Sequence, residues 1–179
     1  LPRRALCDAT AGDVVEVLFE SVGGRRAVPR VARVFGRPGD PDADFEAVVW
    51  HRELRVDFPP EVIAEAEAAS ETIPAAERAR RRDLTALPFV TIDPATARDH
   101  DDAVCLEPLP RGGVRLWVAI ADVAAFVPER SALDREALRR GNSIYFPDRA
   151  IPMLPHRLSG DVCSLLPGVE RLVRVVELE

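Results

Sequence analysis

Apolar residues in the first third of the chain predict a hairpin followed by a segment of undecided structure. Positions 14–19 form a β-rich apolar run, and positions 28–35 place valine among arginine residues. The Gly-Gly pair at 23–24 lies between them and is a signal for a two-residue turn. The pattern therefore predicts a β-hairpin over residues 12–36. Residues 44–51 are compatible with a helix or a strand, because their periodicity does not separate the two.

A helix and a polar linker are predicted next. A proline pair opens a helix over residues 61–69, in which alanine and glutamate dominate and Val62 and Ile63 are expected to face inward. Residues 70–84 are polar and rich in arginine, which predicts a linker with a short helix after Pro74. We expect the linker arginines to form a solvated face rather than a phosphate-binding site.

Short strands and helices alternate in the rest of the chain, which predicts an α+β domain. The run at 114–120 is almost wholly apolar, as is typical of a central strand. Ser131 is the predicted N-cap of a helix that ends at Gly141. The expected strands are 89–92, 103–106, 114–120, 143–146 and 172–178, and the expected helices are 131–140 and 155–166. We place domain boundaries at 1–56 (a small β module), 57–84 (a connector helix and linker) and 85–179.

Composition excludes several kinds of chemistry. The chain has 30 acidic and 24 basic residues, a formal net charge of −6, and every basic residue is arginine. Without lysine, a lysine-dependent phosphate loop, Schiff-base chemistry and a Ser–Lys nucleophile pair are excluded. No apolar run approaches the roughly 18 residues that cross a bilayer, so no membrane partner is expected. Three widely spaced cysteines predict a reducing, cytoplasmic location without disulfides or a zinc site.

A cluster of four aspartates follows the predicted strand at 89–92: Asp93, Asp99, Asp101 and Asp102. Two unit charges about 4 Å apart repel by roughly 4 kcal/mol at an effective dielectric constant near 20. If the four carboxylates converge, a divalent cation or raised pKa values must compensate them. Mg²⁺ suits carboxylate and phosphate ligands, and one or two such ions equip a site for phosphodiester hydrolysis.

Two other interpretations of this cluster remain open, and one is excluded. The carboxylates of a solvated turn diverge, and Asp99-x-Asp101 also fits a weak sugar-nucleotide motif. An EF-hand is excluded, because Arg98 and Pro110 stand where it needs its glycine and its final glutamate.

A second cluster joins two arginines at 139–140 to Tyr145 and Phe146. Basic residues beside aromatic rings are typical of a groove that binds a nucleic-acid backbone and stacks its bases. We expect Phe146 to be a core residue, whereas the sequence leaves Tyr145 open. Trp50 and Trp117 are also expected in the core.

Three polar residues outside these clusters are predicted to be structural or exposed. Asp122 is expected to satisfy backbone donors at a strand end, and His51 and His156 to lie at the surface.

Taken together, these clusters resemble the ribonuclease II / ribonuclease R family of processive 3′→5′ exoribonucleases. The resemblance covers roughly residues 84–179, the opening part of an RNB-type catalytic domain, and the segment before it is similar to the end of an OB-like, cold-shock β-barrel. The matching blocks are 87–93, 97–104, 116–123, 140–147, 151–155, 158–159 and 163–165.

The resemblance implies a role for each candidate residue. Asp93 and Asp102 would hold Mg²⁺ directly, Asp99 would support the metal site, and Asp101 would position a second ion or the attacking water. Tyr145 would stack at the 3′ end of single-stranded RNA. The implied products are 5′-nucleoside monophosphates, and no protein partner follows from the resemblance. A non-catalytic RNA-binding module is the alternative function.

This sequence departs from the family pattern at two places in the acidic segment and in its extent. His100 replaces an aromatic residue or methionine, and we expect it to pack as a flat ring rather than to titrate. Pro94-Ala95 replaces the usual pair after the first aspartate. The chain ends within a predicted strand, and a later arginine and aromatic clamp of the family lie beyond it. We therefore expect a fragment that is inactive alone, from an exoribonuclease parent.

Overall fold

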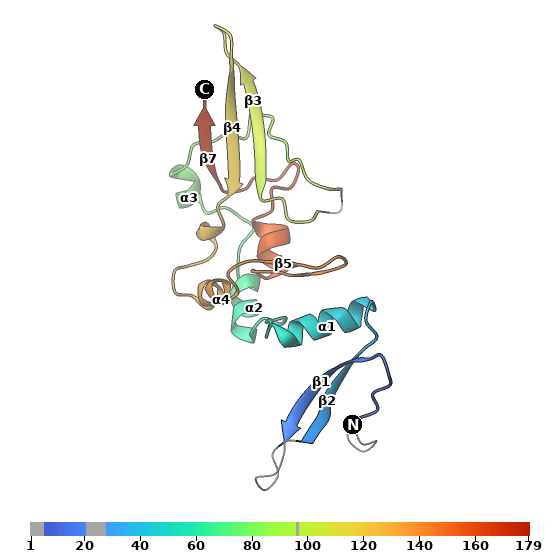
Figure 1. Cartoon of the computed structure of the whole chain (residues 1–179). Helices are drawn as coiled ribbons and strands as arrows, with labels where there is room; N and C mark the ends of the chain where they lie inside the picture. The colour runs from blue at the N-terminus through green and yellow to red at the C-terminus, as the bar shows by residue number, and fades with distance from the viewer. Residues whose placement is uncertain (1–5, 21–27, 96) are drawn as a thin grey trace. The chain divides into compact units, whose positions relative to one another are not determined.

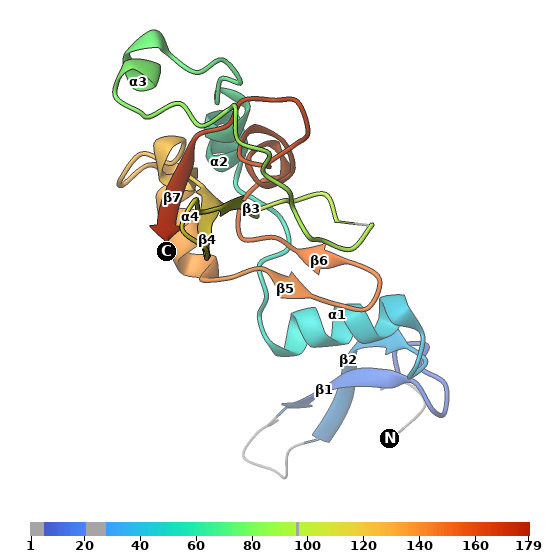
Figure 2. The ribbon, with the colours of Figure 1, turned by 90° about the horizontal axis from the view of Figure 1, so that it is seen from above.

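A computed structural model describes residues 6–20, 28–95 and 97–179. The chain divides into two compact units: Leu1–Asp57 with Tyr145–Ile151, and Phe58–Ile144 with Pro152–Glu179. Both units combine helices with antiparallel strands (Figures 1 and 2). None of the helices in these described ranges has the length and apolarity that crossing a membrane requires.

The first unit contains the predicted hairpin. Strand β1 (Val14–Glu20) pairs antiparallel with β2 (Val28–Gly36), while the predicted turn at 23–24 lies outside the described residues. The undecided segment is a helix, α1 (Pro41–His51). It begins there because the Asp40 carboxylate accepts hydrogen bonds from two N–H groups of the first turn.

A second, short hairpin also belongs largely to this unit. It consists of β5 (Ile144–Tyr145) and β6 (Ala150–Ile151), as Figure 2 shows. Phe146 lies in its turn, is half-buried, and packs edge-on against Phe45 of α1 with ring centroids 4.9 Å apart. The aromatic pair therefore joins the hairpin to α1.

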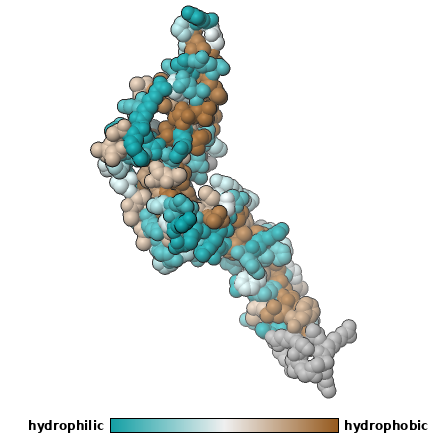
Figure 3. All heavy atoms as spheres, turned by 90° about the vertical axis from the view of Figure 1, so that its left-hand side faces the viewer, coloured by the Kyte–Doolittle hydropathy of each residue, from teal (hydrophilic) through white to brown (hydrophobic). Residues whose placement is uncertain are grey.

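A three-stranded antiparallel sheet organises the second unit. Its strands are β3 (Asp102–Pro108), β4 (Val114–Ala121) and β7 (Val173–Leu178), in the order β3-β4-β7, so β4 is central as predicted. One face buries small and aromatic side chains, including Cys105 and Trp117. The other face exposes the apolar residues Leu106, Val114, Ile120, Val176 and Leu178. Hydrophobic colour is visible on the surface in the upper part of Figure 3.

The predicted strand at 89–92 is wrong. Only Val90 pairs with the sheet, through a single bridge to Val104 of β3. Prolines at positions 88 and 94 bracket this segment and cannot donate ladder hydrogen bonds, so the chain leaves the sheet edge after one bridge.

Short helices complete the second unit. They are α2 (Pro60–Glu67), α3 (Ala75–Ala79), α4 (Ala132–Arg140), a 3₁₀ turn η2 (Val123–Ala125) and a π-helical turn η3 (Arg157–Val162). The predicted caps of α4 are confirmed. Ser131 Oγ accepts the N–H of Asp134 at 3.1 Å, and Gly141 follows with φ of 76°. A positive φ of this kind favours glycine.

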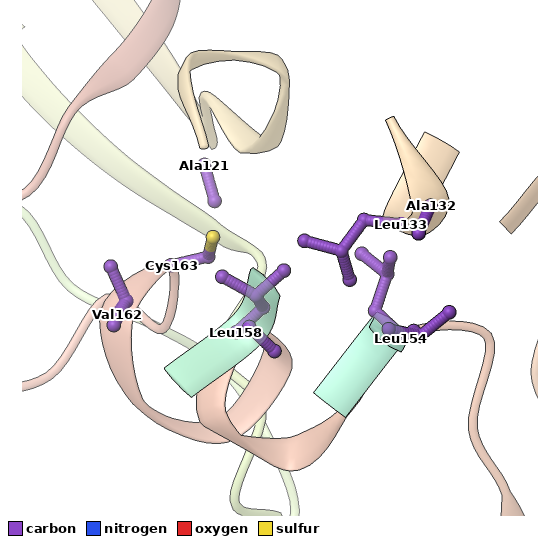
Figure 4. Packing of buried hydrophobic residues seen from close by; sticks show 9 residues of the cluster. Ala121, Ala132, Leu133, Leu154, Leu158, Val162 and Cys163 are labelled. Carbon is purple, nitrogen blue, oxygen red and sulfur yellow. The ribbon is translucent and has the colours of Figure 1, made fainter. Parts of the chain in front are cut away.

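The core of the second unit lies where α2, α4 and η3 meet the end of β4. Leu158 of η3 is 0% exposed and packs among residues of all these elements (Figure 4). The buried members of the cluster are Val62, Ala66, Ala121, Ala132, Leu133, Leu154, Leu158, Val162 and Cys163.

Two predicted core residues are exposed instead. Val62 and Ala66 occupy the inward stripe of α2, one helical turn apart, so Ile63 points away from the core. Trp50 is half-exposed on α1, and the Arg33 guanidinium lies 4.0 Å from its ring centroid. A cation over an aromatic face stabilises such an exposed ring. Trp117 is buried, as predicted.

Candidate active site

The acidic segment, residues 93–101, is here called the acidic loop, because its described residues, 93–95 and 97–101, form neither helix nor strand. It leads directly into β3. At this end of the loop, the backbone N–H of Ala121 donates to the carbonyl oxygen of Asp101 at 2.9 Å. The loop therefore enters the sheet beside Ala121, the last residue of β4, and this hydrogen bond holds the backbone of Asp101 in place.

The four predicted site residues all lie at the surface of the second unit. Asp93, Asp99 and Asp101 belong to the acidic loop, and Asp102 is the first residue of β3. In the part of the chain that the structure describes, no three histidine, cysteine or carboxylate side chains are close enough to hold a metal ion. The four-aspartate ligand set therefore stays a prediction, with oxygen donors of the kind that Mg²⁺ prefers.

The electrostatics of Asp101 link it to the other three aspartates. Desolvation by surrounding protein raises the pKa of its carboxyl group, and the negative charges of Asp99, Asp102 and Asp93 raise it further. A raised pKa is one of the two consequences expected when carboxylates approach one another. The acidic loop is therefore a site of unfavourable negative charge, which a cation would relieve.

The sequence predicted that His100 packs as a flat ring, but its imidazole also makes a polar contact. Its Nδ1 lies 2.9 Å from a carboxylate oxygen of Asp93. Since an ionised carboxylate only accepts hydrogen bonds, Nδ1–H is the donor. His100, which lies between Asp99 and Asp101 in the sequence, therefore holds the side chain of Asp93.

Sequence reasoning missed the contribution of Ser164. This residue is 0% exposed, and its Oγ accepts the backbone N–H of His100 at 3.0 Å. The carbonyl oxygen of His100 in turn accepts the N–H of Leu165 at 2.8 Å. A serine inside the apolar stretch 162–166 was the available signal, because a buried hydroxyl needs a hydrogen-bond partner.

Tyr145 lies on β5 in the first unit and is 74% exposed. Its ring is therefore available for stacking.

Arg140 was predicted to line a groove that binds a nucleic-acid backbone, but its side chain makes contacts within the second unit instead. Its guanidinium lies 3.7 Å from the ring centroid of Phe58, and Nε donates to the buried Glu136 at 3.1 Å. Arg140 thus stabilises the second unit, while Arg139 remains exposed.

Three of the four linker arginines, Arg78, Arg80 and Arg82, are exposed, as predicted for a solvated face, whereas Arg81 is partly buried. Arg81 donates to the carboxylate of Asp122 at 2.6 Å, and Arg174 of β7 donates to its other oxygen at 3.2 Å. Asp122 is 4% exposed. Burial opposes its ionisation, but the two arginine hydrogen bonds outweigh burial and lower the pKa of the carboxyl group. Asp122 was predicted to satisfy backbone donors; instead it joins the linker to β7.

Comparison with known proteins finds a family match over more than half of the chain. The RNB domain matches residues 81–179. Ribonuclease R of Acidithiobacillus ferrooxidans is 51% identical over 170 residues, which cover 94% of this chain and 38% of that protein. Ribonuclease R of Vibrio cholerae is 41% identical over 180 residues, which cover 99% of this chain and 22% of that protein.

Solved structures agree with the sequence comparison. Mycoplasma genitalium RNase R in complex with double-stranded RNA matches with a TM-score of 0.78 and 32% identity, over 99% of this chain and 32% of that chain. The apo form of the same protein gives a TM-score of 0.76. The chain spans well under half the length of these relatives.

Proposed function

The chain belongs to the RNB-domain family, and from this we propose that it forms part of a hydrolytic 3′→5′ exoribonuclease acting on single-stranded RNA. The observation that carries the proposal is the acidic loop, which lies inside the RNB match and contains a carboxyl group, Asp101, whose pKa is raised by desolvation and by its acidic neighbours. The expected products are 5′-nucleoside monophosphates.

Mg²⁺ is the proposed cofactor, as one or two ions. The ligands would be Asp93, Asp99, Asp101 and Asp102, whose oxygen donors and excess negative charge fit a hard divalent cation. When bound, Mg²⁺ would promote ionisation of the attacking water and offset negative charge on the phosphodiester. The residues of this chain would orient the water and the phosphate, and Asp101 would matter most for this positioning.

RNA binding would involve the exposed ring of Tyr145. Stacking on an aromatic ring is tolerant of base identity, which suits an enzyme that removes successive nucleotides. The chain as a whole has a formal net charge of −6, which argues against sequence-blind adhesion to RNA but is compatible with binding at a confined surface. We place the last bases of a single-stranded RNA against this tyrosine.

The domain assignment is part of the same proposal. Residues 1–56 would be the end of an OB-like cold-shock module, 57–84 a connector, and 85–179 the first part of the catalytic domain. The antiparallel β1–β2 hairpin, with irregular register near Val15 and Val17, supports a strongly twisted barrel-type sheet.

A cytoplasmic location is also part of the proposal. Cys105 and Cys163 are buried free thiols, which is compatible with a reducing compartment.

Asp101→Asn in the complete gene product tests the function. We expect hydrolysis of a 3′-labelled single-stranded RNA to be lost, while RNA affinity measured in EDTA is retained. Asp134→Asn, on α4, is the matched control and should leave turnover intact. Unchanged turnover in Asp101→Asn would reject the assignment.

A non-catalytic RNA-binding module is the second candidate. It is favoured by the absence, in the described ranges, of three metal-ligating side chains within reach of one ion. NMR shifts of the acidic loop distinguish the two: the enzyme requires them to move with Mg²⁺, whereas a binding module leaves them unchanged.

A further inference from the structure

Ser164 lies at the junction between the core of the second unit and the acidic loop. It follows η3, whose Leu158 and Val162 are buried in the core, as Figure 4 shows together with Cys163. π-helical turns are uncommon and often accompany functional sites. The segment that carries Ser164 is therefore anchored by some of the most buried side chains of the protein.

The Ser164 backbone is itself held in place. Its N–H donates to the carbonyl oxygen of Asp161 at 3.1 Å, and its carbonyl oxygen accepts Nε of Arg171 at 3.0 Å. Arg171 also donates to the carbonyl oxygen of Asp161 at 3.0 Å. The hydroxyl group therefore projects from a segment with little freedom to move.

Three hydrogen bonds connect this segment to the acidic loop. Ser164 Oγ accepts the N–H of His100 at 3.0 Å and donates to the carbonyl oxygen of Arg98 at 3.4 Å. The N–H of Leu165 donates to the carbonyl oxygen of His100 at 2.8 Å. Together with the bond from Ala121 to Asp101, they direct the loop's backbone polar groups inward. The carboxylates of Asp99 and Asp101 remain at the surface.

Fixing the loop has an electrostatic consequence. Like charges move apart unless the backbone restrains them, and Asp101 already experiences repulsion from its neighbours. In a restrained loop, folding has already supplied the free energy that brings the carboxylates together, so cation binding need not supply it. In an unrestrained loop, each binding event would have to order the loop against this repulsion.

We propose that Ser164 is a positioning residue for the acidic site: its buried hydroxyl fixes residues 98–100 so that the aspartates on either side of His100 are held ready for a divalent cation. This role rests on the proposed function. Ser164 itself touches neither cation nor RNA; it acts through the backbone of His100.

The test is Ser164→Ala in the complete gene product, with Ser131→Ala as the matched control. Both substitutions remove a serine hydroxyl that accepts one backbone N–H at about the same distance, 3.0 Å and 3.1 Å, but Ser131 caps α4. Hydrogen exchange reports the His100 amide without any metal. Calorimetry with MgCl₂ reports cation affinity, and hydrolysis of single-stranded RNA reports turnover against Mg²⁺ concentration.

We expect Ser164→Ala to accelerate exchange at His100 by about tenfold. The Mg²⁺ concentration for half-maximal binding and turnover should rise by about tenfold. RNA affinity in EDTA should stay within about twofold, and Ser131→Ala should leave all three loop measurements within about twofold. Unchanged exchange at His100 or unchanged Mg²⁺ affinity in Ser164→Ala would overturn the proposal.

Two further measurements keep the outcomes distinct. If Ser164→Ala unfolds, Ser164→Cys retains a side chain at the buried position with a weak hydrogen-bond acceptor, and the same shifts are expected in smaller measure. If the wild-type protein neither binds Mg²⁺ nor hydrolyses RNA, the proposed function fails. The exchange measurement then still decides whether Ser164 fixes the loop, and the positioning role toward a cation is rejected.

Discussion

The imidazole Nδ1 of His100 lies 2.9 Å from a carboxylate oxygen of Asp93, across seven positions of the acidic loop. This hydrogen bond connects the first aspartate of the loop to the residue between Asp99 and Asp101. It limits the rotation of the Asp93 carboxylate and closes the loop through its side chains. The backbone bonds of His100 close the same loop from the inner side.

His100→Ala should therefore weaken cation binding without unfolding the chain. Loss of a partner that orients a metal-binding carboxylate typically lowers affinity by about tenfold or more. We expect the Mg²⁺ concentration for half-saturation, measured by calorimetry, to rise by about this factor. His156→Ala, which removes an exposed imidazole elsewhere in the second unit, is the control. Equal affinities in both variants would mean that the contact with Asp93 has no bearing on the cation.

Asp101→Asn should stabilise the metal-free chain at neutral pH. The folded state raises the pKa of Asp101, so the ionised carboxylate is less favourable there than in the unfolded chain. Because Asp101 is exposed and solvent screens its charge, the gain should stay below about 1 kcal/mol. Thermal unfolding followed by circular dichroism should show a rise of at most about 2–4 °C.

The pH dependence of that gain has a definite sign. The carboxylate penalty is present above the raised folded pKa and is lost as pH falls through it, so the two proteins should converge below about pH 4. With saturating Mg²⁺ the wild type should become the more stable of the two proteins, because only the wild type retains all four carboxylates. A destabilised Asp101→Asn at neutral pH without metal would contradict the electrostatic account.

Asp122→Asn should destabilise the second unit. The substitution removes the carboxylate that pairs with both Arg81 and Arg174, so a largely buried group loses its ionic partners. Breaking such a pair should lower the free energy of unfolding by about 1–3 kcal/mol, less than for a fully buried pair because Arg174 is exposed. Asp148→Asn, which disrupts an exposed pair with Arg149, should change stability little.

Stability from Asp122 should disappear in acid. Its folded pKa is lowered, so its contribution is present above the ordinary pKa and is lost as pH falls through the lowered value. The difference between wild type and Asp122→Asn should therefore narrow only below about pH 4. Urea unfolding at several pH values measures it, and a difference that instead narrows between pH 6 and pH 8 would rule out this assignment.

Local signals in the sequence could predict most elements, because their causes lie within a few residues. Ser131 and Gly141 bound α4 by side-chain capping and positive φ, and the apolar run of β4 marks the central strand, which pairs with a neighbour on each edge. The segment at 89–92 could not be predicted in this way. Its residues have high β-propensity and suit a strand, but the prolines on either side lack an N–H group and limit its hydrogen bonds to the sheet.

The candidate site shows the same division. The four aspartates are close in sequence and could be singled out by charge alone. Ser164 could not, because its contact with His100 spans 64 positions and depends on how η3 packs in the core. Nor could the partners of Asp122, since Arg81 and Arg174 come from a linker and a strand that only the folded chain brings together.

Tyr145→Ala should reduce RNA affinity while leaving stability intact. The side chain is largely exposed, so its removal costs the fold little, whereas a stacked base contributes about 1–3 kcal/mol. The dissociation constant for a short single-stranded RNA, measured in EDTA by fluorescence anisotropy, should rise at least about fivefold. Tyr145→Phe keeps the ring and should bind like wild type. Weak binding by Tyr145→Phe would assign the interaction to the hydroxyl group instead.

Leu158→Ala tests whether the core supports the acidic loop. Leu158 is fully buried on η3, six positions before Ser164, and truncation of a buried leucine costs about 2–5 kcal/mol. Leu138→Ala, on the outer face of α4 where the side chain is 82% exposed, removes the same atoms and should cost little. Urea unfolding gives the free energies. Because the loop is hydrogen-bonded to the segment that Leu158 anchors, exchange at the His100 amide should accelerate in Leu158→Ala and not in Leu138→Ala. Slow exchange at His100 in a destabilised Leu158→Ala would mean that the loop is held independently of the core.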